Sequence, residues 1–174
     1  MPAEPTTPTV LTTDRLIIRP IETRDADAWA AMSADPAVME HFTTGTLDRA
    51  AADRMLARMR EQHLQEGFGL AAVERTADGV FLGFTGIHRH RWFPGEVEIG
   101  WRLARHAWGH GYATEAATAW IRHAFDELGL PRLISVTVPA NTRSIAVMRR
   151  LGFTLWQETT HDGLDLVVYA RDAG

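Results

Sequence analysis

The sequence predicts a single α/β domain in which one central sheet has helices on both faces. At 174 residues the chain has the length of one ordinary domain with a buried core. Its hydrophobic content of 45% and charged content of 23% are typical of a globular protein. Short β-branched or alternating segments are interleaved with longer segments whose apolar residues recur every three or four positions, which favours strands and helices in one layered fold.

The N-terminal part is predicted to contain a tail, a strand and two helices. Residues 1–12 are rich in proline and lack the basic and apolar segments of a leader or anchor, so we expect a flexible tail followed by a domain over residues 13–174. Leu16–Pro20 alternates as a strand does. A helix is predicted from near Ala26 to the breaking pair Asp35-Pro36. A second helix, with apolar residues spaced by four, is predicted to end before Gly67.

The remaining elements are predicted from hairpin signals, β-branched segments and one long apolar face. The helix that begins near Ala113 keeps this face for four turns to Leu128, and Gly129 ends it. The other predicted elements are strands Phe68–Glu74, Val80–His88, Glu96–Leu103, Leu133–Val138, Phe153–Thr160 and Leu164–Ala170, and a short helix Asn141–Leu151.

A glycine turn, Gly109-His110-Gly111, joins the strand Glu96–Leu103 to the long helix. Glycine reaches backbone conformations that let successive N–H groups converge on one point. The free N–H groups of the helix start add partial positive charge there. The turn therefore indicates a phosphate or pyrophosphate site, with an ordinary strand-to-helix turn as the alternative.

Several motifs occur in the order found in one large enzyme family. They are DRLIIRP at Asp14–Pro20, DPAVM at Asp35–Met39, FLGFTGI at Phe81–Ile87, EIGW at Glu98–Trp101, WGHGYATEA at Trp108–Ala116, Asn141–Ser144, and MRRLGF at Met148–Phe153. In this order the chain resembles the GNAT superfamily of N-acetyltransferases, close to its RimJ/RimL-like branch. The resemblance covers nearly the whole chain. It implies a mixed, mostly antiparallel sheet with a splayed parallel strand pair that admits the cofactor.

The resemblance also implies acetyl-CoA as the donor. Its pyrophosphate would lie on the backbone of Ala107, Trp108, Gly109, His110, Gly111 and Tyr112. The pantetheine arm would bond the backbone of Trp101 and Leu103, with Asn141 on the opposite side. An N-cap of the following helix is an alternative role for Asn141, and both roles are compatible. Arg102 and Arg105 are candidates for nearby positive charge, or else solvated arginines.

Acetyl transfer requires a proton acceptor for the ammonium and a proton donor for the departing thiolate. Many members of the resembled family use a tyrosine as the donor, at the position held here by Met148. Ser144 is the alternative that related RimL-like enzymes suggest, although a serine in a first helical turn can simply bond the backbone. Glu98 is the preferred proton acceptor because it belongs to EIGW. Glu96, His88 and His90 are the other candidates in this region.

Composition narrows the function classes. A net charge of −4 and a pI near 6 argue against nucleic-acid binding. The absence of cysteine removes thiolate metal sites and an acyl-cysteine intermediate. The His106/His110 and His88/His90 pairs share no helix face or thiolate partner, so we expect no metal. No apolar segment has the length of a membrane span, and we expect a cytoplasmic protein, with a homodimer as one possible assembly.

The sequence thus predicts an acetyl-CoA-dependent N-acetyltransferase that works by direct transfer. A peptide or protein N-terminal amine is the leading acceptor, and a small amine such as a polyamine, amino sugar or antibiotic is the first alternative. A non-catalytic acyl-CoA-binding module is the second alternative, because Met148 stands at the usual tyrosine position.

Overall fold

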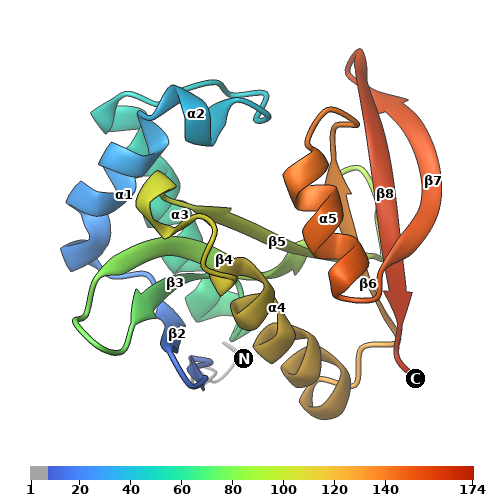
Figure 1. The fold of residues 1–174 in the computed structure, drawn as a ribbon, viewed down its shortest axis with the longest axis horizontal. Coiled ribbons are helices and arrows are strands. Elements are labelled where there is room, and N and C mark those ends of the chain that lie inside the picture. Colours follow the sequence, from blue (N-terminus) through green and yellow to red (C-terminus); the bar gives the residue numbers. More distant parts are fainter. Residues whose placement is uncertain (1–7) are drawn as a thin grey trace, which may run out of the picture.

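One eight-stranded sheet organises the chain in the computed structural model, which describes residues 8–174 (Figure 1). Its strand order is β1-β2-β3-β4-β5-β6-β8-β7, and all neighbours are antiparallel except β5 and β6. The strands are β1 Leu11–Thr12, β2 Leu16–Pro20, β3 Leu70–Arg75, β4 Phe81–Arg89, β5 Val97–Leu103, β6 Arg132–Thr137, β7 Thr154–His161 and β8 Leu164–Asp172. The predicted mixed, mostly antiparallel sheet with one parallel pair is confirmed.

The helices are α1 Ala26–Ser33, α2 Pro36–Met39, α3 Arg49–Glu66, α4 Tyr112–Arg122 and α5 Thr142–Arg150. Helix α4 continues through a π-helical turn, His123–Glu127, as the long apolar face predicts. Helix α2 was not predicted. Asp35-Pro36 ends α1 and also starts α2, because the Asp35 carboxylate accepts the N–H of Ala37 at 2.9 Å and proline suits the first position of a helix.

The predicted N-terminal tail lies only partly within the structure. Residues 1–7 are outside the described residues. Leu11 and Thr12, which belong to the same predicted segment, pair with Ile18 and Ile17 of β2. A two-residue strand carries too little periodicity to be recognised in the sequence.

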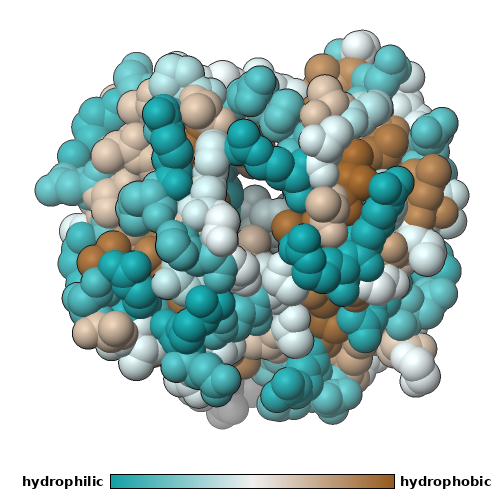
Figure 2. Space-filling model, in the orientation of Figure 1, coloured by the Kyte–Doolittle hydropathy of each residue, from teal (hydrophilic) through white to brown (hydrophobic). Residues whose placement is uncertain are grey.

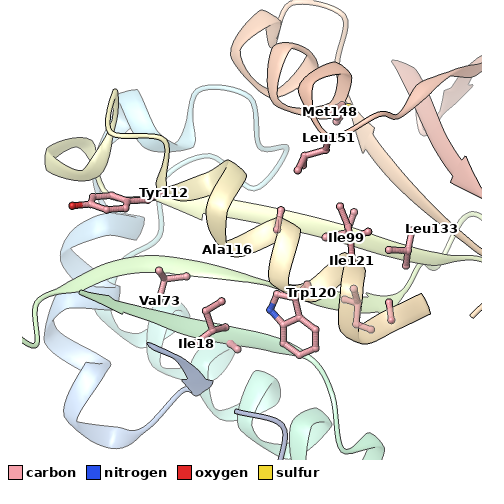
Figure 3. Close-up of a cluster of buried hydrophobic side chains, with 14 of the residues drawn as sticks. Ile18, Val73, Ile99, Tyr112, Ala116, Trp120, Ile121, Leu133, Met148 and Leu151 are labelled. Atoms are coloured by element: carbon pink, nitrogen blue, oxygen red, sulfur yellow. The ribbon is translucent and has the colours of Figure 1, made fainter. Parts of the chain in front are cut away.

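Apolar side chains cover both faces of the sheet. On one face, Trp120 and Ile121 of α4 pack in the same cluster as Ile99 of β5, Met148 of α5 and Leu151, which directly follows α5 (Figure 3). The other face carries α1, α2 and α3, whose buried side chains join those of β3 and β4. The sheet therefore separates an α4/α5 side from an α1/α2/α3 side.

A buried ion network fixes the start of α1 against the sheet. Arg19 of β2 donates to both carboxylate oxygens of Asp25 at 2.8 Å and to Glu74 of β3 at 2.7 Å. Burial acts to raise the pKa of Asp25, but the hydrogen bonds from Arg19 and from the N–H of Glu22 hold it below its usual value. The network fixes the start of α1, and α2, which follows α1 in the chain, lines the cavity described below.

Strands β5 and β6 separate almost as soon as they meet (Figure 1). Their one register pair is Glu98 with Ile134. Beside it, side chains replace the ladder: the N–H of Val136 donates to Glu98 Oε1 at 3.1 Å, and Ser135 Oγ donates to the carbonyl of Ile99 at 3.0 Å. The two side chains satisfy backbone groups that a regular parallel pair would have satisfied.

Candidate active site

A cavity of about 710 Å³ is lined by residues of one strand, β5, and of three helical segments. Figure 2 shows the surface hollowed near its centre, between the α1/α2 side of the molecule and α5. Its walls are residues of β5, the start of α4, α5, and the α2 segment with the residues that follow it. Ser144 and all the residues predicted to bind acetyl-CoA line this cavity except His110. The predicted proton acceptor Glu98 does not line it, nor do the other candidates Glu96, His88, His90 and Arg105.

The glycine turn has the backbone conformation that the sequence predicted. Gly109 and Gly111 have φ of 78° and 79°, a region that favours glycine. Gly111 is the residue before α4, so the first N–H groups of α4 have no carbonyl partner within the helix. His110 instead turns its ring towards Tyr112, and its carbonyl accepts from Arg15 Nη2 at 3.0 Å. The lining N–H groups suit an anion.

The β5 wall presents Trp101 and Leu103 to the cavity. The carbonyl of Leu103 already accepts a hydrogen bond from Trp108 Nε1 at 2.8 Å. The indole of Trp108 is in turn covered by the guanidinium of Arg143 of α5, 4.4 Å from the ring centroid. These contacts give the glycine turn a fixed position between β5 and α5.

The position of Asn141 is compatible with both predicted roles, the N-cap of α5 and a contact of the pantetheine arm. Its Oδ1 accepts the N–H of Ser144 at 3.2 Å, which caps α5, and its Nδ2 donates to Thr137 Oγ1 at 3.0 Å. Asn141 and Ser144 also line the cavity. Because the cap uses the backbone N–H of Ser144, the cap does not depend on the serine hydroxyl.

Met148, at the position where the resembled family usually has tyrosine, is 1% exposed and packs in the core. Tyr112 does not replace it. Figure 3 shows Tyr112 at the other end of α4 with its hydroxyl directed away from Met148. Ser144 is therefore the hydroxyl that lines the cavity on α5.

Glu98 lies in a separate polar cluster at the junction of β5 and β6. Its Oε2 is 3.2 Å from His88 Nε2 and 3.4 Å from His90 Nε2, while its Oε1 accepts from Val136. The carboxylate is thus engaged on both oxygens. Glu96 lies just before β5. In residues 8–174 its side chain forms no hydrogen bond with Glu98, His88 or His90.

The pKa values of His88 and His90 are shifted in opposite directions. Desolvation acts to lower the pKa of His88, but the hydrogen bond and charge of Glu98 outweigh it and raise the pKa above its usual value. Desolvation lowers the pKa of His90. His90 Nδ1 accepts the N–H of Trp92 at 3.1 Å, so its proton is on Nε2, facing Glu98. Glu98 thus favours the protonated form of His88, whereas burial favours the neutral form of His90.

The two candidate arginines have different surroundings. Arg105 is exposed and pairs with Asp35 at 2.6 Å. Arg102 is buried and lines the cavity beside Phe42, whose ring centroid is 3.8 Å from its guanidinium. The lining by Glu40, His41 and Phe42 was missed in the sequence, because this segment is short, irregular and without periodicity.

Within residues 8–174, no group of three or more His, Cys, Asp and Glu side chains is arranged to hold a metal ion. No helix in this part of the chain is both long and apolar enough to cross a membrane.

Comparisons with known proteins agree on one family. Residues 15–154 match the family described as an acetyltransferase (GNAT) domain. The uncharacterized N-acetyltransferase p20 of Bacillus licheniformis is 31% identical over 145 residues, 82% of this chain and 81% of that protein. A crystal structure of an acetyltransferase from Agrobacterium tumefaciens is 32% identical, with a TM-score of 0.82 over 94% of each chain. Mycothiol acetyltransferase of Pseudarthrobacter chlorophenolicus is 35% identical over 160 residues, 88% of this chain and 47% of that protein.

The bridge between β5 and β6 predicts a difference between two changes at Glu98. Glu98→Gln keeps an oxygen that accepts the N–H of Val136, so its stability should stay close to wild type. Glu98→Ala leaves this part-buried N–H without its acceptor and should lower the free energy of unfolding by about 1 kcal/mol. Chemical denaturation of the three proteins measures this, and equal stability of both variants would show that the bridge does not hold the strands.

Proposed function

Because the chain belongs to the GNAT family of acetyltransferases and is an N-acetyltransferase, we propose that it moves an acetyl group from acetyl-CoA directly to a primary amine in a ternary complex. One observation carries this proposal: a single cavity joins the glycine turn before α4 to Asn141 and Ser144 on α5. Direct transfer fits a chain without cysteine, since no thiol can hold the acetyl group between two half-reactions.

The residues at the cavity fit acetyl-CoA. The pyrophosphate would accept from the N–H groups of the turn Ala107–Tyr112, where both glycines have the required conformation and the helix start adds positive charge. The pantetheine arm would run between Trp101 and Leu103 on β5 and Asn141 on α5. The bound thioester supplies the activated acetyl group. The protein orients it and manages two protons.

Ser144 is our candidate for stabilising the departing thiolate. It lines the cavity, and its hydroxyl is not needed for the cap of α5. A hydroxyl can donate a hydrogen bond to a thiolate as charge develops, although it is a weak acid. Met148 cannot replace it, because it has no proton to donate and is enclosed in the core.

Glu98 is our candidate for accepting the ammonium proton, acting through water because its side chain does not line the cavity. His88 and His90 hold its second oxygen and form a path for the proton once it leaves the amine. This places the proton acceptor at the point where β5 and β6 separate.

The acceptor proposed first is an α-amine, with a peptide or protein N-terminus as the leading case. It rests on the likeness of EIGW, WGHGYATEA and MRRLGF to the RimJ/RimL-like branch. A small amine is the second candidate, and the similarity to a mycothiol acetyltransferase favours it. A homodimer and a cytoplasmic location remain predictions, which sedimentation and cell fractionation test.

Release of free thiol tests the function as a whole. The protein is incubated with acetyl-CoA and a panel of N-terminal peptides, free amino acids, polyamines and amino sugars, and thiol release is followed over time. Amine-dependent release supports the enzyme, and kcat/KM ranks the acceptors. Coenzyme A binding without release for any amine would favour the non-catalytic binding module.

The first prediction for this function concerns the glycine turn. Gly111→Asp should weaken coenzyme A binding by tenfold or more, because a carboxylate would occupy the anion position next to the α4 start. Gly129→Asp is the matched control: Gly129 has φ of 63° and open space around it, and aspartate tolerates this region comparably at both positions. Calorimetry measures both affinities. An equal loss in both variants would assign the effect to backbone strain.

The second prediction concerns Ser144. Ser144→Ala should lower kcat by about tenfold or more with little change in acetyl-CoA affinity, because the lost interaction forms as the thiolate departs. Its thermal stability should match wild type, since the cap uses the backbone N–H. A normal kcat in the folded variant would show that Ser144 has only a structural role in the first turn of α5.

The third prediction concerns pH. An α-amine titrates near pH 8 and a lysine-type amine near pH 10, so the rate should rise with pH as the free amine becomes available. Glu98→Gln should flatten or shift this rise, because the variant can no longer take the proton. Steady-state rates over this range measure it. An unchanged profile would transfer the role to Glu96, His88 or solvent.

A further inference from the structure

Arg102 carries a buried positive charge that no carboxylate in residues 8–174 neutralises. The residue is 8% exposed, and its Nε and Nη1 atoms are enclosed without any hydrogen-bond partner. Burial lowers the pKa of Arg102 to about 10. An enclosed charge without a partner is unfavourable for folding, so its presence calls for a physical reason.

Aromatic rings hold the guanidinium but do not satisfy it. It lies 3.8 Å from the ring centroid of Phe42, 5.2 Å from that of Phe84 and 6.0 Å from that of Trp29. A ring face attracts a cation but accepts none of its in-plane N–H bonds. Arg19 shows the contrast within the same chain, because it is equally buried and is paired with both Asp25 and Glu74.

The guanidinium is reached from the cavity. Arg102 lines the cavity, and Nη2 is the nitrogen that is not among its enclosed atoms. Glu40 also lines this wall, but its ion pair is with His41 at 3.7 Å and its side chain is 66% exposed. The site is therefore a fixed, aromatic-backed cation that opens into the cavity.

Arg102 and the glycine turn belong to opposite sides of the sheet. Side chains alternate along β5, so that Ile99 and Leu103 join the cluster of α4. Arg102 instead lies against Phe42 and Phe84 of the cluster formed with α1, α2 and α3. The N–H groups at the start of α4 and the guanidinium of Arg102 therefore line different parts of the same cavity.

We propose that Arg102 binds a carboxylate of the acceptor, so that the protein acetylates an amine that also carries an acid group, as a free amino acid does. The inference rests on the proposed transfer to a primary amine and names its substrate class. A carboxylate matches the planar fork of a guanidinium and forms charge-assisted hydrogen bonds with it. Binding the acid group on the α2 side leaves the amine free to point along the cavity towards Ser144 and the thioester.

Matched substrate pairs test this proposal. For wild type, kcat/KM for an amino acid should exceed that for its carboxamide by about tenfold or more, because the neutral amide leaves the buried charge unpaired. In Arg102→Met, which keeps an apolar stem beside Phe42, the preference should fall to near unity through a raised KM for the acid. Arg102→Lys should retain part of it. Arg105→Met, which removes an exposed arginine paired with Asp35, should leave the preference unchanged.

Two measurements separate this proposal from its rivals. Calorimetry should give the same coenzyme A affinity for wild type and Arg102→Met; a loss of that affinity with the acid preference intact would assign Arg102 to the cofactor phosphates and overturn the proposal. Equal use of acid and amide by wild type would also overturn it while leaving the acetyltransferase function in place. If no amine is turned over, the proposed function fails, and binding of the amino acid then tests the inference by itself. The amino acid should raise the Tm of wild type but not that of Arg102→Met.

Discussion

The separation of β5 from β6 after a single register pair is the constraint on which the rest of the structure depends. A regular parallel pair would close the sheet and leave no cavity. Separating the strands exposes backbone groups that must find other partners, and the carboxylate of Glu98 and the hydroxyl of Ser135 supply them. Ile99 of β5 and Trp120 of α4 belong to one buried cluster, so β5 and α4 are packed firmly against each other beside the cavity.

The same constraint couples stability to chemistry. Glu98 holds the two strands with one oxygen and two imidazoles with the other, so the group that we propose as the proton acceptor is also structural. Arg102, by contrast, does not stabilise the fold. Its unpaired charge opposes folding and is tolerated because aromatic side chains and the remaining core supply the stability. Glu98 stabilises the strands beside the site, whereas the unpaired Arg102 lowers the free energy of unfolding, and binding of a carboxylate would compensate for that loss.

Local signals predicted most of the fold and the conformation of the glycine turn. The glycine turn and the α4 face are set by neighbours in sequence, and both were located correctly. What the sequence did not predict depends on distant contacts. Helix α2 needed the double role of Asp35-Pro36, and the position of Glu98 outside the cavity follows from a bond to Val136 across the gap. Spacing along a strand gives the face of a side chain but not its partner.

This division explains why the motifs describe the donor better than the acceptor. The wall that we propose for the donor comes mainly from Trp101, Leu103 and the turn Ala107–Tyr112, which are close together in the sequence. The opposite wall brings Arg102 against Phe42, sixty positions earlier in the chain, through the packing of α1 and α2 on the sheet. A change in that segment alters what the cavity accepts without touching the glycine turn. If Arg102 binds the acceptor as we propose, acceptor choice in this protein depends on tertiary packing, and the unpaired guanidinium is the feature of that packing with the most definite chemistry.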